Sequence, residues 1–463
     1  MSVPKKSETV FVCQACGFES PKWAGQCVCG AWNSFVEESL APSREDPRRP
    51  GRAGVLAGGR SAPVRLGEVR ADAYERFDTG LSELNRVLGG GIVRGSVTLI
   101  SGEPGIGKST IITEAAAKVA GRYGRVLYVS GEESEEQIKL RADRVCGELP
   151  QELYLLSETN IERILDAAAK LAPVFLIVDS IQTLYAGALE SAPGSVSQVR
   201  ACTSALLRYG KGEGVPVFIV AHVTKAGDLA GPRIVEHLVD CVLQFAGERD
   251  QDLRVIRSNK NRFGATNEIG AFEMAESGLI PIENLSQSFL ESMDGAAEGA
   301  VATAVYEGSR PLLLELQALT APAGVGFARR TALGVEIARL NMILAVLERH
   351  AGLKLVERDV YVNVVGGLKP EGTSIDLAVA LAIYSSYRGA PIGTKTLAIG
   401  EISLTGELRT VRYAERITRE AARLGFARVI LPKKNADRIG LPISGLRVSG
   451  VADLPAAIAA LAT

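Results

Sequence analysis

Residues 97–109 read VTLISGEPGIGKS, an apolar run followed by a glycine-rich loop that ends in lysine and serine. A helical pattern follows, so the loop has the strand-then-helix context that a G-x-x-x-x-G-K-S phosphate loop requires. Its backbone N–H groups and the helix N-terminus favour a polyphosphate, so we predict a site for ATP with Mg²⁺ rather than a chance glycine turn. The predicted contact residues are Gly102, Glu103, Pro104, Gly105, Ile106, Gly107, Lys108, Ser109 and Thr110.

Lys108 is expected to reach the β- and γ-phosphates, and Ser109 to bind Mg²⁺ through its hydroxyl. A further strand, which ends in a carboxylate, supports this site. Asp179 ends the apolar run VFLIVD, which is the pattern that places an acid beside the magnesium ion.

Two acids and a histidine end neighbouring apolar runs. Glu132 and Glu133 follow RVLYVSG, and His222 ends VPVFIVAH. One glutamate is expected to polarise the attacking water and the other to stabilise a helix N-terminus, and we assign the catalytic base to Glu132. His222 is either a sensor of the γ-phosphate or a structural histidine.

Apolar runs alternate with helical patterns through the middle of the chain, which predicts a doubly wound α/β fold. Four runs are expected to form buried parallel strands: 97–101, 125–130, 174–179 and 215–222. The runs CVLQFA, DLRVIRS and AFEMAE are more amphipathic and are expected to extend the sheet in antiparallel fashion. From about residue 287 the pattern restarts, which predicts a separate α/β or α+β domain.

Four of the seven cysteines crowd near the N-terminus, and together they predict a zinc-finger-like module. They form the pairs Cys13-x-x-Cys16 and Cys27-x-Cys29. Four thiols in so short a module suit tetrahedral Zn²⁺, although a C-x-C pair forms a tighter ring than C-x-x-C, so weaker binding or another metal remains an alternative. The following Pro-, Gly- and Arg-rich stretch predicts a flexible linker.

Bulk properties exclude several classes of protein. The formal net charge is −1 over 463 residues, so any contact with nucleic acid must come from local basic patches. The apolar runs have the length of strands rather than of membrane spans, so no membrane association is expected. The N-terminus MSVPKKSETV lacks an apolar signal core, which makes cytoplasmic residence the default expectation.

These features together resemble the bacterial RadA (Sms) family of DNA repair proteins over essentially the full length. The resemblance rests on KWAGQCVCGAWNSF, on TGLSELNRVLGGGIVRGSVTLISGEPGIGKST, on the pentapeptide KNRFG at 260–264 and on a C-terminal region similar to the proteolytic domain of Lon. It implies a cysteine module at 9–36, a linker at 37–62, a RecA-like ATPase domain at 63–286 and a Lon-protease-like α/β domain at 287–463.

The resemblance also implies a function and partners. Such proteins form hexameric rings, hydrolyse ATP in response to single-stranded DNA, and promote branch migration of intermediates made by RecA. Lys260 and Arg262 would then face the nucleotide of the neighbouring subunit as catalytic cations. The loops 186–197 and 225–233 correspond to DNA-facing loops, and we expect Lys225 and Arg233 to contact the phosphates of single-stranded or branched DNA.

The C-terminal region departs from Lon at the residues that cleave peptides. Lon uses a Ser–Lys dyad. Ser374 falls at the serine position, but Glu415 falls at the lysine position. We therefore expect a non-proteolytic domain. Two alternatives to a DNA-dependent, helicase-like ATPase stay open: an ATP-gated recombination adaptor that does not translocate, and an ATP-dependent serine peptidase.

Overall fold

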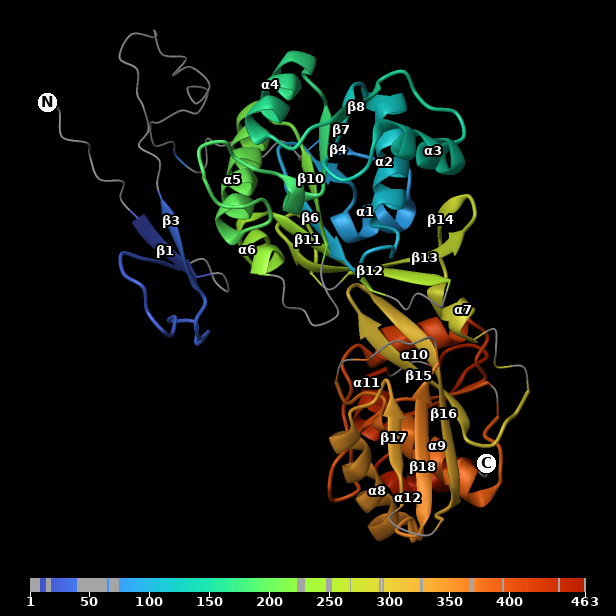
Figure 1. The fold of residues 1–463 in the computed structure, drawn as a ribbon. Coiled ribbons are helices and arrows are strands. Elements are labelled where there is room, and N and C mark those ends of the chain that lie inside the picture. The colour runs from blue at the N-terminus through green and yellow to red at the C-terminus, as the bar shows by residue number, and fades with distance from the viewer. Residues whose placement is uncertain are drawn as a thin grey trace, which may run out of the picture. The chain divides into compact units, whose positions relative to one another are not determined.

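A computed structural model of the chain describes residues 9–13, 18–39, 65, 75–222, 230–246, 252–266, 268–290, 293, 295–324, 328–365, 370, 372–393, 395–439 and 442–461. These residues form two compact units that divide between Glu283 and Asn284 (Figure 1). The described part of the chain contains no helix with the length and apolarity needed to cross a membrane.

The cysteine module is a small antiparallel sheet in the order β2-β1-β3. Its strands are β1 (Thr9–Cys13), β2 (Glu19–Ser20) and β3 (Phe35–Ser39). Among the described residues, its buried core consists of Cys13, Cys27 and Phe35, with Phe11 and Ala24 packed against them. So small a core supplies little hydrophobic stabilisation, which is typical of a module that depends on a metal to fold.

The centre of the first unit is a nine-stranded sheet in the order β14-β13-β12-β11-β6-β10-β9-β7-β8. From β11 to β8 every neighbouring pair is parallel, whereas β12, β13 and β14 are antiparallel. The strands are β6 (Val97–Gly102), β7 (Val126–Ser130), β8 (Leu153–Ser157), β9 (Phe175–Asp179), β10 (Val217–His222), β11 (Cys241–Ala246), β12 (Leu253–Asn261), β13 (Ile269–Ala275) and β14 (Gly278–Pro281).

The predicted parallel strands are confirmed, and the antiparallel extension is confirmed with one correction. The run CVLQFA, which forms β11, lies parallel to β6, so the extension starts one strand later than expected. A hydrophobic pattern cannot distinguish the two directions for a single strand. The edge strand β8 was not predicted; its residues are half-buried or exposed, so it lacks the continuous apolar run of the inner strands.

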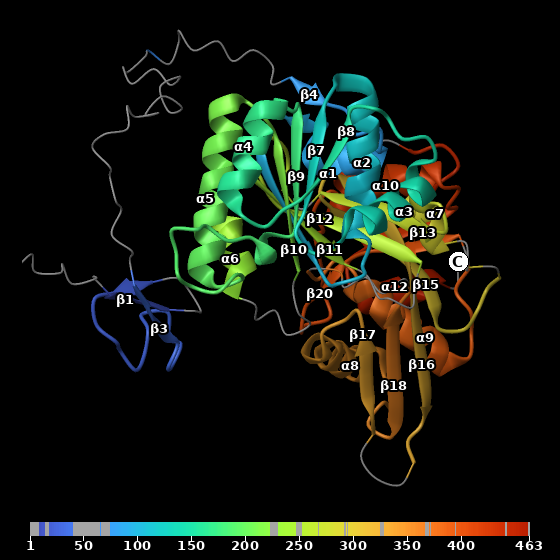
Figure 2. The ribbon, with the colours of Figure 1, turned by 45° about the horizontal axis from the view of Figure 1, so that its top comes forward.

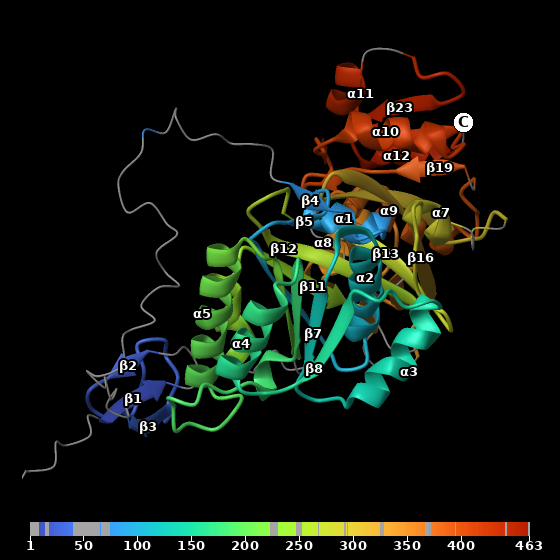
Figure 3. The same cartoon turned by 90° about the horizontal axis from the view of Figure 1, so that it is seen from above.

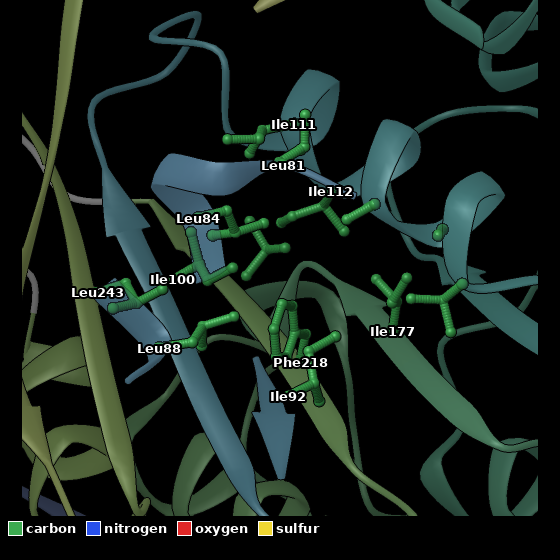
Figure 4. Packing of buried hydrophobic residues seen from close by; sticks show 14 of the residues in the cluster. Leu81, Leu84, Leu88, Ile92, Ile100, Ile111, Ile112, Ile177, Phe218 and Leu243 are labelled. Carbon is green, nitrogen blue, oxygen red and sulfur yellow. The ribbon is translucent and has the colours of Figure 1, made fainter. Parts of the chain in front are cut away.

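Helices cover both faces of this sheet, because alternate strand residues point to opposite sides. Ile100 packs with residues of α1 (Ser82–Leu88), α2 (Lys108–Tyr123) and α3 (Glu135–Cys146), and Figure 4 shows part of this cluster. Leu99 packs on the other face with α4 (Ile161–Leu171), α5 (Val196–Glu213) and α6 (Ala230–Leu238). The two helical layers flank the strands in Figures 2 and 3.

The second unit is built on a seven-stranded mixed sheet in the order β17-β18-β16-β15-β19-β22-β23. Its strands are β15 (Ala300–Glu307), β16 (Arg310–Pro322), β17 (Arg330–Leu333), β18 (Arg358–Val364), β19 (Thr396–Ala398), β22 (Arg428–Pro432) and β23 (Arg447–Val451). The apolar run KTLAIGEIS at 395–403 divides between two sheets, since β19 joins this sheet while β20 (Glu401–Ile402) pairs with β21 (Leu408–Arg409).

Six helices accompany this sheet within the described residues. They are α7 (Leu285–Leu290), α8 (Ile337–Ala351), α9 (Asp376–Arg388), α10 (Ala414–Arg423), α11 (Lys433–Ile439) and α12 (Leu454–Leu461). α9 is the most buried of them, with every residue from Asp376 to Ile383 inside the core. The predicted α/β fold class, with a cysteine module, a P-loop core and a C-terminal Lon-like domain, is confirmed.

Candidate nucleotide site

The glycine-rich loop joins the central strand β6 to helix α2. β6 ends at Gly102 and α2 begins at Lys108, so the loop lies at the carboxyl end of the parallel strands, where α/β proteins bind ligands. Gly107 caps the helix with φ of 112°, a left-handed conformation that residues with a Cβ rarely adopt. The helix N-terminus is thereby turned toward the loop.

Lys108 is held inside this loop. Its Nζ donates to the carbonyl oxygens of Gly102 and Glu103, both at 2.8 Å, and the residue is 3% exposed. Burial lowers the pKa of Lys108 to about 8, although Asp179, Glu132 and Glu103 act in the opposite direction. A triphosphate would replace two neutral carbonyls by charged oxygens, which are stronger partners for an ammonium group.

Asp179 meets the start of α2 from the neighbouring part of the sheet. Its Oδ2 accepts hydrogen bonds from Ser109 Oγ and from Tyr128 Oη, each at 2.7 Å. A hydroxyl beside a carboxylate is an all-oxygen donor set of the kind that Mg²⁺ prefers. Ser109 and Asp179 would therefore hold the ion, which would neutralise charge on the phosphates when bound.

The two adjacent glutamates have different partners. Glu133 is bound by the guanidinium of Arg141, with Nη1 2.7 Å from Oε1. Glu132 accepts a hydrogen bond from Ser180 Oγ at 2.5 Å, and its Oε2 lies 3.4 Å from His222 Nε2. Because the charge of Glu133 is compensated by an arginine, the geometry favours Glu132 as the carboxylate that orients water.

A cavity of about 510 Å³ joins these groups at the carboxyl end of the sheet. It is lined by Pro104, Gly105, Gly107, Lys108, Ser109, Thr110, Ser130, Glu132, Glu133, Arg141, Arg144, Asp179, His222 and Met274. Three expected contact residues do not line it. Gly102 and Glu103 instead hold Lys108 through their carbonyls, and Ile106 is 2% exposed in the core.

The sequence analysis missed several groups around this cavity. Tyr128, Arg141, Arg144 and Met274 belong to β7, α3 and β13, and no spacing motif marks them. A hydroxyl inside the otherwise apolar run VLYV is the one local signal for Tyr128. Burial beside Asp179 raises the pKa of Tyr128 well above its ordinary value, so this hydroxyl stays protonated.

Lys260 and Arg262 lie at the end of β12 and do not line the cavity of their own subunit. Lys260 Nζ donates to the carbonyls of Glu236 at 2.9 Å and His237 at 3.1 Å, at the C-terminal end of α6. Arg262 Nη1 lies 3.2 Å from Asp240 Oδ1, yet its side chain is 56% exposed. Arg262 is thus anchored at one side and accessible at the other.

The other residues of the pentapeptide fix its turn. Asn261 Nδ2 donates to the Val87 carbonyl at 3.2 Å, and the Phe263 carbonyl accepts from Arg76 Nη2 at 2.9 Å. A Cβ added to Gly264 would lie 2.8 Å from the Cα of Gly89, so the two backbones approach too closely for a side chain. This rigid turn determines where Arg262 is presented.

A hydrogen bond joins two residues that precede the two candidate DNA loops. Gln182 Nε2 donates to the His222 carbonyl at 3.0 Å, and Gln198 bonds the backbone of Ala186, Leu189 and Ser191. Lys225 lies outside the described residues. Arg233 belongs to α6, but its side chain also lies outside the described part of the chain.

Three of the four predicted zinc ligands lie together. The Sγ atoms of Cys13, Cys27 and Cys29 are all within 4.8 Å of one another, and Cys13 and Cys29 are 3.9 Å apart. Tetrahedral Zn²⁺ with Zn–S bonds of ~2.3 Å requires S–S separations of roughly 3.8 Å. The cluster therefore fits zinc, and Cys16, the fourth predicted ligand, lies outside the described residues.

The shortened C-x-C pair is accommodated by a tight turn. The Gly30 N–H donates to the Cys27 carbonyl at 2.8 Å, and the Cys27 N–H donates to the Ala31 carbonyl at 2.9 Å. Of the remaining cysteines, Cys202 and Cys241 are buried and Cys146 is half-buried, and none of the three belongs to a second cluster of possible metal ligands within the described residues.

Ser374 lines a second cavity, of about 410 Å³, in the C-terminal unit. The cavity is lined by Tyr306, Gly372, Thr373, Ser374, Glu401, Thr410, Val411, Arg412, Tyr413 and Ile417. No lysine is among these described residues. Glu415, at the position of the Lon lysine, is paired with Arg419 at 2.8 Å.

Family models match three parts of the chain. A rubredoxin metal binding domain matches residues 11–37, an AAA domain matches 62–228, and the subunit ChlI of Mg-chelatase matches 333–435. These matches agree with the cysteine cluster and with the P-loop site, and they cover the start, the core and the end of the chain.

Curated relatives cover nearly the whole chain. The DNA repair protein RadA of Bacillus subtilis is 47% identical over 98% of both chains. That of Streptococcus pyogenes serotype M6 is 48% identical over 96% of this chain and 97% of its own, and that of Listeria monocytogenes is 45% identical over 96% of each. The resemblance inferred from the motifs is confirmed, and the chain belongs to the RadA family of DNA repair proteins.

Proposed function

We propose that this protein is a DNA-stimulated ATPase of recombination that processes recombination intermediates by ATP-driven movement on single-stranded or branched DNA. It works as a cytoplasmic homo-hexamer and promotes branch migration initiated by RecA. Lys108, Ser109 and Asp179 bind ATP with Mg²⁺, and Glu132 orients the attacking water. Lys225 and Arg233 contact DNA phosphates.

One observation supports the proposed coupling between DNA binding and ATP hydrolysis. His222 lies 3.4 Å from Glu132, its carbonyl accepts from Gln182, and the chain then enters the second DNA loop. Contact of DNA with either loop therefore acts on a residue that touches the proposed base. A shift of His222 would reorient the carboxylate of Glu132 and change the rate of hydrolysis.

Lys260 and Arg262 complete the site of the neighbouring subunit. A cation supplied in trans stabilises the charge that develops on the γ-phosphate and makes hydrolysis depend on assembly of the ring. The exposed guanidinium of Arg262 on its rigid turn supports this role. Lys260 stabilises this turn, because its ammonium binds the carbonyl end of α6. Through that contact it can transmit the state of the neighbour's nucleotide to α6.

The direct test is ATP turnover measured with and without single-stranded DNA, on particles whose mass is determined in parallel. We expect a stimulated rate, hexamer-sized particles and, for His222→Asn, a lower ratio of stimulated to unstimulated turnover. An ATP turnover rate that no form of DNA changes would refute the proposal of a DNA-driven ATPase motor. DNA stimulation without strand unwinding or branch extension would favour the adaptor, which shares the nucleotide site.

The cysteine module is proposed to hold one Zn²⁺ through Cys13, Cys16, Cys27 and Cys29. The separation of the three described sulfur atoms supports this, and metal analysis of the purified protein tests it. We expect one zinc per chain. A chain that contains no zinc, or that keeps its module folded after chelation, would contradict the proposal.

A further inference from the structure

Tyr128 is a buried polar residue beside the nucleotide site that has no role in the nucleotide contacts proposed above. It lies on β7, next to β9, and is 2% exposed. Its Oη donates to Asp179 Oδ2 at 2.7 Å, while Arg141 Nη2 lies 3.4 Å from the same Oη. Tyr128 therefore connects the magnesium carboxylate to an arginine that lines the nucleotide cavity.

The direction of these hydrogen bonds follows from their chemistry. A guanidinium group only donates, and a phenol has a single proton. Tyr128 Oη therefore accepts from Arg141, and its own proton is directed at Asp179. Arg141 is itself fixed, because its Nη1 binds Glu133 and its side chain is 12% exposed.

This arrangement determines how Asp179 presents its oxygens. Within the described residues, the side chain of Asp179 accepts two hydrogen bonds, and both end on Oδ2, one from Ser109 and one from Tyr128. If the Ser109 hydroxyl bound a metal ion, the hydrogen bond from Tyr128 would still hold the carboxylate of Asp179 in place. Asp179 would then offer Oδ1 to the ion or its water shell in an orientation set by Tyr128.

We propose that Tyr128, oriented by Arg141, is a positioning residue that raises the affinity of the site for magnesium-bound nucleotide. The proposal rests on the nucleotide site assigned above but does not require that the protein move on DNA. It concerns binding of the ion, so it can be tested without measuring turnover.

The test is a Mg²⁺ titration of fluorescent ADP analogue binding to the full-length protein. For Tyr128→Phe we expect the half-saturating Mg²⁺ concentration to rise about tenfold, the lower end of the range for loss of one hydrogen bond to a charged group. Analogue binding in EDTA should not change, because the P-loop is intact. Tyr123→Phe is the matched control. Its hydroxyl accepts a hydrogen bond from the Asp78 N–H at 3.1 Å and is not a partner of Asp179.

A second variant keeps the proposal testable if Tyr128→Phe does not fold. Arg141→Lys retains a cation for Glu133 but loses the planar fork that reaches Tyr128, so it too should raise the Mg²⁺ requirement. If Tyr128→Phe folds and its Mg²⁺ requirement is unchanged, the proposal is overturned. If only Arg141→Lys folds, an unchanged Mg²⁺ requirement in that variant overturns it. A wild-type protein that binds magnesium nucleotide without hydrolysing it would instead refute the proposed function alone.

Discussion

Ser109 and Ser374 lie at similar places in two different α/β units, but their neighbours differ. Each lies at the start of a well-buried helix, and each lines a cavity. Ser109 follows a lysine and bonds Asp179. Ser374 lacks a lysine among the residues described around its cavity, and the nearby acid Glu401 is bound by Thr373 at 2.8 Å.

The comparison indicates that the function of a serine at the start of a helix depends on the residues that strands elsewhere in the chain place beside it. In the first unit, the end of β9 brings Asp179 to Ser109, and the segment after β7 brings Glu132 to the same cavity. In the second unit, the Lon lysine position carries Glu415, whose carboxylate binds Arg419 on its own helix. The predictions below test whether one serine site is active and the other is not.

The largest effect is expected for Lys108→Ala. Loss of the cation that contacts the β- and γ-phosphates should lower ATP turnover about a thousandfold. The fold should survive, because removing a buried ammonium relieves its desolvation. Steady-state turnover and thermal unfolding measure the two effects. The control is Lys118→Ala on the same helix, which loses a surface pair with Glu114 and an exposed hydrogen bond to the Gly80 carbonyl; an equal loss of turnover in that variant would contradict the assignment.

Arg262→Ala should lower turnover about a hundredfold, as for removal of one donor to the transition state. Lys211→Ala is the matched control, since Lys211 Nζ also lies 3.2 Å from Asp240 Oδ1. It should leave turnover almost unchanged.

Mixing the inactive variants tests whether Arg262 acts in trans. A mixed ring places an intact Arg262 from the Lys108→Ala chain beside the intact P-loop of the Arg262→Ala chain. Turnover should therefore partly return on mixing. If it does not, Arg262 acts within its own subunit or not at all.

A smaller effect is expected from pH. The pKa of Lys108 is about 8 without nucleotide, and bound phosphates must raise it because they stabilise the ammonium. Affinity is then constant below pH 8 and falls above it, by at most tenfold per pH unit, until the pH reaches the raised pKa. Calorimetry of ADP binding at pH 8.5 in buffers of different ionisation enthalpy should detect proton uptake. Absence of uptake would mean that Lys108 is already charged.

Much of this nucleotide site could be predicted, because its motifs are local. The loop before Lys108 and the acid that ends β9 are recognisable from a few neighbouring residues, and the parallel strands follow from continuous apolar runs. The assignment of the base to Glu132 rather than Glu133 has no such local signal. The two glutamates differ in the structure because Arg141, on the following helix, binds Glu133.

Other features depend on contacts that no local pattern encodes. The direction of β11, the edge strand β8 and the division of KTLAIGEIS between two sheets are decided by tertiary pairing. The same holds for Lys260. Its position in the pentapeptide gave no sign that its ammonium binds the carbonyl end of α6.

The smallest expected effect sharpens the comparison of the two serines. Ser109→Ala should raise the Mg²⁺ requirement, because it removes one proposed ligand, whereas Ser374→Ala should leave ATP turnover within about twofold of wild type. The wild-type protein should not degrade casein, since the position of an activating lysine holds a glutamate paired with Arg419. Casein cleavage that disappears in Ser374→Ala would show that a different residue activates this serine. The second cavity would then be an active site in its own right.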